Sequence, residues 1–276
     1  MSVVSSASLR SSVTARLRAA GCVFAEDEAR ILLAAAGSAA ELAVMVSDRA
    51  AGRPLEHVVG WAEFAGLRIA VDPGVFVPRR RSEFLVRTAV ALTAPALTAP
   101  ALTGEDALVV DLCCGSGALG AALAASAGRP VTLHAADLDP AAVRCARRNL
   151  AAAGAEVYEG DLFEALPADL RGRVDVLLAN VPYVPTADVE LLPAEARLHE
   201  ARPALDGGTD GLDVLRRVAA DAPHWLAPGG TLLFETSDRQ AATALDVVTA
   251  AGLTAALAFD DDLDATVVTA TRPAAG

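Results

Sequence analysis

The feature that most constrains the fold is a regular alternation of short apolar runs with helical segments, which begins after residue 106. Each apolar run has the length and aliphatic content of a buried strand, and each is followed by a turn and a helical pattern. Repeated units of this kind predict an α/β protein with a mostly parallel, doubly wound sheet. Strands are expected at residues 108–110, 131–135, 156–158, 174–179 and 231–235, and helices at 118–127, 140–153, 211–226 and 241–251.

The last two strands depart from this alternation. Apolar runs at 255–259 and 265–270 are joined only by a short turn around Asp260, Asp261 and Asp262. Because so short a turn joins antiparallel neighbours, we expect a hairpin at the edge of the sheet, with an antiparallel last strand. The three aspartates are interpreted as a solvated turn and not as a metal site.

The N-terminal part has a different pattern. Leu9, Val13 and Leu17 recur at helical spacing, and acidic residues 26–28 suit the first turn of a second helix. A third helix is expected near 39–51. Two strand-like runs, 57–61 and 67–71, then predict a hairpin. The expected organisation is a helical N-terminal substrate-docking domain at 1–55, a β-hairpin linker at 56–81 and the α/β domain at 82–276.

Several segments bear on the compartment. Residues 1–10 lack the charged and apolar regions of a secretory signal, and the four cysteines match neither a disulfide framework nor a zinc site. The repeat at Thr93–Thr103 contains two prolines and no charge, which indicates a surface connector, not a membrane span. We therefore expect a cytoplasmic protein with reduced thiols, no membrane association and no bound metal.

The charge of the chain limits its partners. The formal net charge is −12, and every basic residue is an arginine. The absence of lysine excludes a Schiff-base lysine and a phosphate-binding lysine. Broad affinity for nucleic acid is not expected from so acidic a chain, and a partner with a basic surface fits it better.

Acidic residues and glycines gather where the first three strands end. The segment Asp111–Gly117 follows the first strand and opens a helix, and its glycines allow close approach to a ligand. An acid at this point would repel a pyrophosphate but suits S-adenosylmethionine, which carries an ammonium and a sulfonium. Asp137 ends the second strand, where it can accept hydrogen bonds from ribose hydroxyls, and Asp161 follows the third strand, near the expected adenine amino group. The expected cofactor-binding residues are Asp111, Cys113, Cys114, Gly115, Ser116, Gly117, Asp137, Leu138, Asp161, Leu162 and Asn180.

Helix capping is the competing interpretation of these acids. Asp139, before Pro140, is a good N-cap candidate and is interpreted as one. Capping does not explain why Asp111, Asp137 and Asp161 share one edge of the sheet, so cofactor binding is preferred for them.

The fourth strand runs into Asn180-Val181-Pro182-Tyr183. This element resembles the Asn-Pro-Pro-Tyr signature of the protein-(glutamine-N5) methyltransferases that modify bacterial peptide chain release factors. Further similar segments are 53–60, 63–66, 77–83, 199–205, 207–211, 228–230, 234–235 and Gln240. The resemblance covers most of the chain and implies a Rossmann-like class I methyltransferase domain joined by a hairpin to a helical N-terminal domain. It also implies S-adenosylmethionine as cofactor and a protein substrate, such as a release factor.

The chemistry of this loop agrees with the resemblance. An amide nitrogen is a poor nucleophile because its lone pair is delocalised. The side-chain oxygen of Asn180 and the carbonyl of Val181 can accept its two N–H bonds and favour the positive charge that develops on it. Pro182 fixes the turn, and the ring of Tyr183 can pack against the flat acceptor. We expect these four residues to be catalytic, and no general base is required before the attack.

The chain departs from the family pattern at three positions. Val181 replaces the first proline of the signature, Cys113 replaces a glycine, and Arg80 replaces a proline, which indicates a divergent member. Two alternatives stay open: an adenine-N6 nucleic-acid methyltransferase, which shares the Asn-x-Pro-Tyr element, and a non-catalytic protein that retains the cofactor fold. The three consecutive cations Arg79–Arg81 are interpreted as a solvated or salt-bridged hinge.

Overall fold

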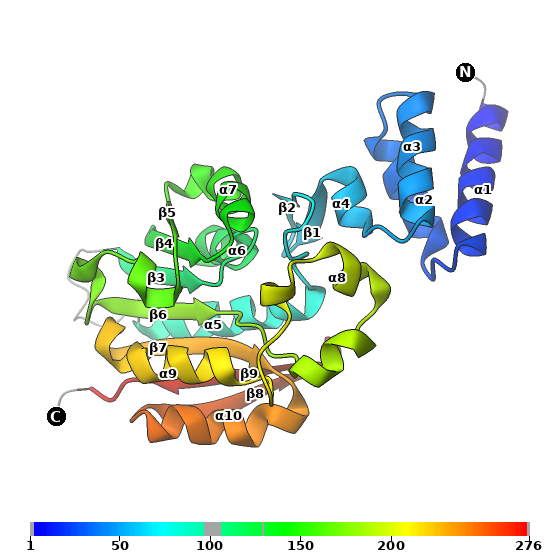
Figure 1. The fold of residues 1–276 in the computed structure, drawn as a ribbon. Helices are drawn as coiled ribbons and strands as arrows, with labels where there is room; N and C mark the ends of the chain where they lie inside the picture. Colours follow the sequence, from blue (N-terminus) through cyan, green and yellow to red (C-terminus); the bar gives the residue numbers. More distant parts are fainter. Residues whose placement is uncertain (1–2, 97–105, 129, 275–276) are drawn as a thin grey trace.

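The computed structural model describes residues 3–96, 106–128 and 130–274. Three helices form the N-terminal part, α1 (Val3–Ala19), α2 (Ala25–Ala35) and α3 (Ala39–Ala50), and they stand apart from the larger α/β body (Figure 1). Val13, Leu17, Leu32 and Val46 fill a small core of their own. Leu9, at the same helical spacing, is 40% exposed. The expected helical pattern is therefore confirmed, although Leu9 does not enter the core.

A buried ion pair crosses this small core. Arg49 on α3 donates from Nε to Glu28 Oε2 on α2 over 2.6 Å, and both side chains are shielded from solvent. Arg49 also lies 2.7 Å from a carboxylate oxygen of Glu195, which belongs to α8 (Ala194–His199) in the larger body. One guanidinium thus connects the helical part to the rest of the chain.

The linker contains a helical turn that the sequence pattern does not predict. Residues Leu55–Val59 form α4, and strands β1 (Trp61–Phe64) and β2 (Leu67–Ala70) then pair as the expected antiparallel hairpin. The expectation of a strand at 57–61 is wrong. Val58 and Val59 pack on the core of the helical domain, and Gly60, with φ of 81°, ends the turn by donating to the Glu56 carbonyl. Tertiary packing therefore outweighs the strand propensity of the two valines.

The large sheet has seven strands in the order β5-β4-β3-β6-β7-β9-β8. Strands β3 to β7 are parallel, and β9 runs antiparallel to both of its neighbours. This confirms the doubly wound sheet, the C-terminal hairpin at its edge and the antiparallel last strand. The strands are β3 (Ala107–Leu112), β4 (Val131–Asp137), β5 (Glu156–Glu159), β6 (Val174–Ala179), β7 (Leu226–Thr236), β8 (Thr254–Asp260) and β9 (Ala265–Thr271).

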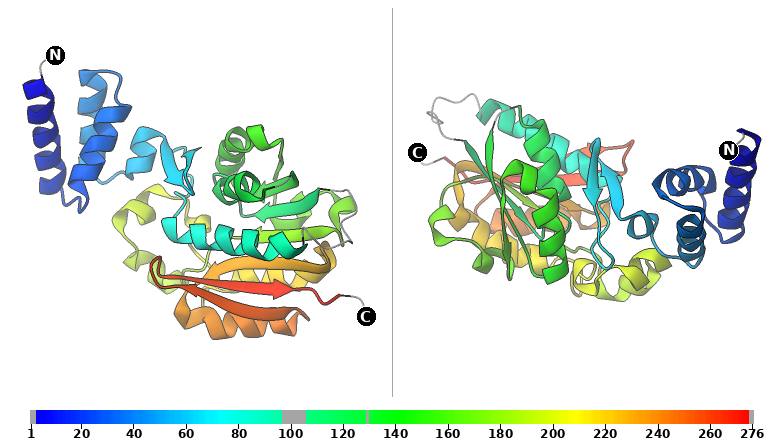
Figure 2. Two further views of the ribbon diagram at one scale, coloured as in Figure 1. Left: turned by 180° about the vertical axis from the view of Figure 1, so that it is seen from behind. Right: turned by 90° about the horizontal axis from the view of Figure 1, so that it is seen from above.

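Helices cover both faces of this sheet, as the views from behind and above show (Figure 2). One apolar cluster joins the sheet to α5 (Glu83–Ala96), α6 (Ala118–Ser126) and α7 (Pro140–Asn149). The other joins it to α9 (Asp213–Trp225) and α10 (Asp238–Ala250).

Two further segments differ from the sequence expectation. The pattern predicts no helix over 83–96, yet α5 lies there and includes the start of the proposed connector; the connector's residues 97–103 lie outside the described residues. Helix α7 ends at Asn149, earlier than expected, and a separate single turn covers Ala151–Ala153. Among the described helices, none has both the length and the apolar content needed to cross a membrane.

Candidate active site

The carboxyl ends of the parallel strands open into a cavity of about 880 Å³. The segments that follow β3, β4, β5 and β6 all contribute to its wall, as expected for a doubly wound sheet. Most of the residues expected from the sequence line it, namely Cys113, Cys114, Gly115, Ser116, Asp137, Leu138, Asp161, Leu162, Asn180, Val181, Pro182 and Tyr183. Asp111 and Gly117 are not among the lining residues.

The loop after β3 has an unusual backbone. Cys113, Gly115 and Gly117 adopt φ angles of 54°, 55° and 77°. Asp137 Oδ2, at the end of β4, accepts the Gly115 N–H over 2.8 Å, and its Oδ1 accepts the Asp139 N–H over 2.9 Å. The loop is therefore held against β4 in the conformation that brings its backbone to the cavity. Cys113 occupies the left-handed region without being a glycine, at a conformational cost.

Asp111 lies in β3, just before this loop. Its carboxylate is fully buried, and Oδ2 accepts the N–H of Gly120 in α6 over 2.9 Å. Oδ1 has no hydrogen-bond partner among the described residues. Burial raises the pKa of Asp111 to about 7, and the neighbouring charge of Asp137 acts in the same direction. Asp111 is not among the residues that line the cavity, and its Oδ2 joins β3 to α6, so its expected contact with a cofactor stays a prediction.

The other acids are placed as follows. Asp137 lines the cavity; burial raises its pKa, while the N–H groups of Asp139 and Gly115 oppose that shift. Asp161 Oδ2 lies 2.7 Å from Arg217 Nη2, a partner on α9 that the sequence pattern does not indicate. Asp139 Oδ1 accepts the Ala141 N–H over 2.8 Å, which confirms its interpretation as the N-cap of α7.

Residues 180–186 form a loop directly after β6, here called the acceptor loop because the sequence predicts that it holds the methyl acceptor. The side-chain oxygen of Asn180 is buried and has no hydrogen-bond partner among the described residues, although Asn180 lines the cavity. A buried acceptor without a partner is rare and costly unless a ligand satisfies it. Val181 is buried, and its side chain packs in the apolar cluster on the α9 side of the sheet.

A second loop, residues 207–211, packs against the acceptor loop and is here called the glycine loop. The N–H of Gly207 donates to the Val184 carbonyl over 2.8 Å, and the N–H of Thr186 donates to the Gly208 carbonyl over 2.8 Å. A Cβ at Gly207 would lie 2.6 Å from the Pro182 oxygen, and one at Gly211 would lie 2.3 Å from the Tyr183 oxygen. Only glycine therefore permits this approach of the two backbones.

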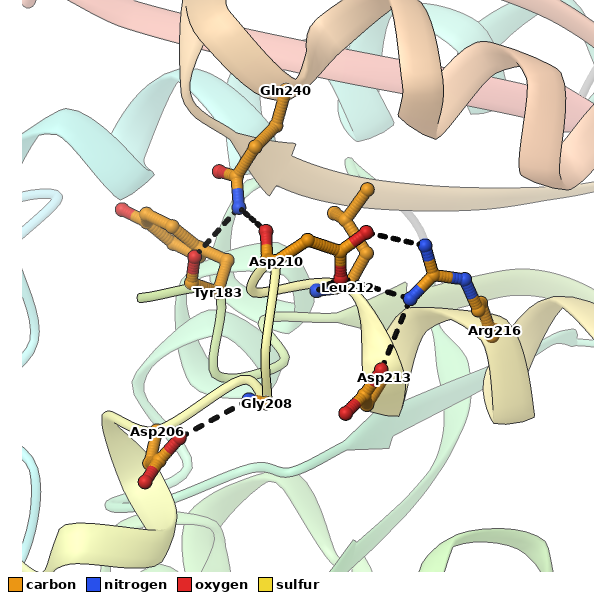
Figure 3. Close-up of polar contacts among 8 residues, drawn as sticks. All are labelled: Tyr183, Asp206, Gly208, Asp210, Leu212, Asp213, Arg216 and Gln240. Carbon is orange, nitrogen blue, oxygen red and sulfur yellow. Dashed lines mark hydrogen bonds and ion pairs between the residues drawn. The ribbon is translucent and has the colours of Figure 1, made fainter. Parts of the chain in front are cut away.

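Figure 3 shows how the glycine loop is fixed in turn. Gln240, from α10, donates its side-chain amide to the carbonyls of Tyr183 and Asp210, each over 2.9 Å. Asp210 also pairs with Arg216 on α9, and its Oδ1 accepts the Leu212 N–H over 3.1 Å. The acceptor loop, the glycine loop and two helices thus form one connected network.

The sequence reading missed a polar network around the hydroxyl of Tyr183. Tyr183 donates to Glu235 Oε1 over 2.6 Å, and Ser82 donates to Glu235 Oε2 over 2.6 Å. Arg81 pairs with Glu235 Oε1 over 2.7 Å and also contacts the Tyr183 hydroxyl. Burial and the Glu235 carboxylate raise the pKa of Tyr183 well above its ordinary value, so the phenol stays neutral. The sequence signal was present only as a glutamate near the end of β7.

Two further contacts tie the linker to the site. Arg79 donates from Nη2 to both oxygens of the buried Glu200, over 2.6 and 2.7 Å. The side chain of Asn149 accepts the Ala70 N–H over 2.9 Å and donates to the carbonyls of Ala70 and Ser116, each over 2.8 Å. The salt-bridged interpretation of the Arg79–Arg81 segment is therefore confirmed for its first and last residues. Asn149 connects the linker strand β2 to the cavity loop.

Comparisons with known proteins agree with this geometry. The chain matches the family described as the methyltransferase small domain over residues 67–211. It is 39% identical over 196 residues to a release factor glutamine methyltransferase of Streptomyces coelicolor, covering 71% of this chain and 67% of that protein. It is also 38% identical over 199 residues to a 4-amino-L-phenylalanine/4-methylamino-L-phenylalanine methyltransferase of Streptomyces pristinaespiralis, covering 72% and 66%.

A solved structure supports the fold alone. The ribosomal protein L11 methylase of Lactobacillus delbrueckii subsp. bulgaricus matches with a TM-score of 0.50 and 14% identity, covering 74% of this chain and 85% of that one. At this identity the likeness concerns the architecture of the methyltransferase domain and not the substrate.

Proposed function

The chain belongs to the release factor glutamine methyltransferase family, and from this premise we propose that it methylates the side-chain amide nitrogen of a glutamine in a protein, with S-adenosylmethionine as methyl donor. The observation that carries the proposal is the buried oxygen of Asn180, which lines the cavity and has no partner among the described residues. The most specific form of the proposal names a bacterial peptide chain release factor as the protein substrate.

The residues at the strand ends fit S-adenosylmethionine. They offer a carboxylate at Asp137 and a loop whose backbone comes close to the cavity at Gly115. Acceptors of this kind suit vicinal hydroxyls and an ammonium group, and the cavity is large enough for a nucleoside-sized ligand. When bound, the cofactor supplies an electrophilic methyl group. We propose that Asp137 holds the ribose, that the Cys113–Gly117 loop and Leu138 border it, and that Asp161 and Leu162 border the adenine. Asp111 joins β3 to α6 next to this loop, because its Oδ2 accepts the Gly120 N–H.

Asn180 and Val181 hold the acceptor in this proposal. The orphaned oxygen of Asn180 accepts one N–H of the substrate amide, and the carbonyl of Val181 accepts the other. Accepting both N–H bonds orients the nitrogen and stabilises the positive charge that it develops. The Pro182 turn and the Tyr183 ring limit how the flat group can rotate.

The domain organisation follows the same reasoning. We propose that residues 1–55 dock the protein substrate and that residues 82–276 bind the cofactor and carry the acceptor site. Residues 56–81 form the β-hairpin linker between these two domains. The Arg49–Glu195 pair supports this, because it joins α3 to the helix beside the cavity. The proposed site of action is the cytoplasm.

A second acceptor class has one observation in its favour. The relative from Streptomyces pristinaespiralis is named for methylation of an aromatic amine on an amino acid. Such an amine is also a flat group with two N–H bonds, so the same loop could hold it.

The deciding experiment uses the full-length protein with methyl-labelled S-adenosylmethionine. The acceptors to compare are purified release factors, a release factor whose acceptor glutamine is replaced, duplex DNA, and 4-amino-L-phenylalanine. Label on a glutamine of the release factor, located by mass spectrometry, is the expected result. Label only on the free amino acid would favour the second acceptor class, and label only on adenine would establish a nucleic-acid methyltransferase. Absence of transfer to any acceptor, with the cofactor bound, would indicate a non-catalytic protein.

A further inference from the structure

The network around the Tyr183 hydroxyl has features that substrate contact alone does not require. We propose that Glu235 is a positioning residue: together with Arg81 and Ser82 it fixes Tyr183 and couples the linker to the acceptor loop. This rests on the proposed function of the acceptor loop, since Tyr183 is placed there as the wall against the substrate amide.

Glu235 lies where three parts of the chain meet. Its side chain is 3% exposed at the end of β7, and both of its oxygens are used. Oε1 accepts from the Tyr183 hydroxyl and pairs with Arg81, while Oε2 accepts from Ser82. A carboxylate that is so buried needs both a cation and hydrogen bonds. The arrangement therefore satisfies every oxygen of Glu235 only when Tyr183 and the linker residues are in place together.

The partners come from segments with different roles. Tyr183 belongs to the acceptor loop, and Arg81 and Ser82 lie at the junction between the linker and α5. The guanidinium of Arg81 lies 5.7 Å from the centre of the Tyr183 ring and lines the cavity. A displacement of the linker would therefore withdraw the cation from Glu235 and loosen the tyrosine ring.

The chain also holds the Tyr183 backbone independently. Gln240 donates to the Tyr183 carbonyl, so the main chain is fixed from α10 while the hydroxyl is fixed from β7. With both ends of the residue held, the ring has one orientation toward the cavity. The function of Glu235 is thus specific to the ring and separable from the support of the loop backbone.

The first test is kinetic and uses Glu235→Gln, Tyr183→Phe and the double variant. An amide cannot accept from all three donors without turning its own N–H toward one of them. We expect Glu235→Gln to lower kcat by about 10- to 100-fold, the range for loss of a charge-assisted hydrogen bond, with cofactor affinity unchanged by calorimetry. In the Tyr183→Phe background the same change should cost much less, because the hydroxyl that Glu235 holds is already gone. Equal losses in both backgrounds would overturn the proposal.

A matched control is available for Arg81. Arg87 also pairs with an acid, Asp260, and lies 5.7 Å from the centre of a ring, that of Phe84, but it does not line the active-site cavity. Arg81→Gln should reduce kcat and Arg87→Gln should not. If both variants or neither lose activity, the specific role of Arg81 is refuted.

A spectroscopic test needs no turnover. Tyr158 and Tyr183 are the only tyrosines, so Tyr158→Phe leaves a single tyrosine signal when the protein carries ¹³C-labelled tyrosine. Slow ring flipping is expected for Tyr183, and faster flipping when Glu235→Gln is added. An unchanged ring signal would refute the positioning role even if glutamine methylation is established. If Glu235→Gln changes the Tyr183 ring signal but the protein methylates none of the acceptors, the positioning role of Glu235 stands and only the proposed function is refuted.

Discussion

The side-chain amide of Gln240 lies 2.9 Å from the carbonyl oxygen of Tyr183 and 2.9 Å from that of Asp210, so one donor group joins the acceptor loop to the glycine loop. Gln240 is the only glutamine in the chain, and Asn149 and Asn180 are the only asparagines. All three side-chain amides therefore lie at the cavity or hold its walls, where a group that both donates and accepts is needed.

Gln240→Glu is expected to damage the enzyme more than Gln240→Ala. Alanine removes three hydrogen bonds, the two that Gln240 donates and the one that it accepts from Ser237, at about 3 kcal/mol of stability in total. Glutamate keeps an acceptor for Ser237 but turns a carboxylate oxygen toward two carbonyl oxygens. Thermal denaturation and kcat should both rank wild type above alanine and alanine above glutamate. The reverse order for the two variants would contradict the donor role of Gln240.

Asn180→Ala is expected to lower turnover by roughly two to three orders of magnitude, the scale seen when one preorganised polar group is lost from a transition state. Cofactor affinity should change little, because Asp137 and the loop after β3 are untouched. Single-turnover kinetics on the methylated substrate measure the first quantity and calorimetry the second. If most of the rate survives in Asn180→Ala, the acceptor is held elsewhere.

Asp137→Ala is expected to weaken S-adenosylmethionine binding by about 1.5–3 kcal/mol, as for a lost hydrogen bond to a charged group. The variant should also loosen the cavity loop, because Asp137 accepts the Gly115 N–H. Asp139→Ala provides the matched control. It removes the N-cap of α7, two residues further along the chain, and should lower stability by about 1 kcal/mol with cofactor affinity retained. Unchanged affinity in folded Asp137→Ala would exclude this carboxylate from the cofactor site.

Asp111 predicts a pH dependence of stability. Its pKa is about 7 in the folded protein and 3.8 ordinarily, so the folded state binds the proton more tightly. Stability is then greatest below pH 4 with respect to this group and falls as the pH rises toward 7. Asp111→Asn should reduce the fall in Tm between pH 5 and pH 8, by about 2–4 °C for each kcal/mol removed. Parallel Tm profiles for the two proteins would show that Asp111 does not titrate in this range.

Arg49→Met is expected to destabilise the protein by about 3–5 kcal/mol, because it leaves the Glu28 carboxylate buried without a cation. The double change with Glu28→Gln should recover part of this loss, since no unpaired charge remains in the core. Denaturant unfolding of the single and double variants measures both effects. A double variant less stable than Arg49→Met would contradict the account.

The sheet was predictable because its strands are short aliphatic runs with helices between them, and such runs have few alternatives to burial. The strand at 57–61 was not, because Val58 and Val59 favour a strand locally while the helical domain's core takes them as part of α4. Helix α5 was missed because its apolar sequence merges into the Thr93–Thr103 repeat, whose uncharged composition and prolines indicate a connector.

The sequence predicted the site residues that lie at the ends of strands, but not the residues that pair with them from other parts of the fold. Asp137 ends a strand, Asn180 and the Cys113–Gly117 loop directly follow strands, and parallel strands bring their carboxyl ends together. Arg81 and Glu235 are separated by more than half of the chain, and Arg217 reaches Asp161 from α9. Such pairings depend on how helices and linker pack on the sheet. The bond from the Gly120 N–H to Asp111 Oδ2 likewise depends on how α6 packs on the sheet and not on the place of Asp111 in the sequence.

The position of β9 between β7 and β8 has a consequence for synthesis on the ribosome. Among the described strands β8 pairs with β9 alone, and β7 has β9 as its neighbour on that side. During vectorial synthesis β8 emerges first and has no partner in the sheet until residues 265–271 follow it. Each of the strands β4 to β7 can pair with a strand made before it, whereas β9 takes its place between two strands that are already made, β7 and β8. Until then β7 and β8 are two unpaired edges of the nascent chain, and unpaired edges can associate with other chains.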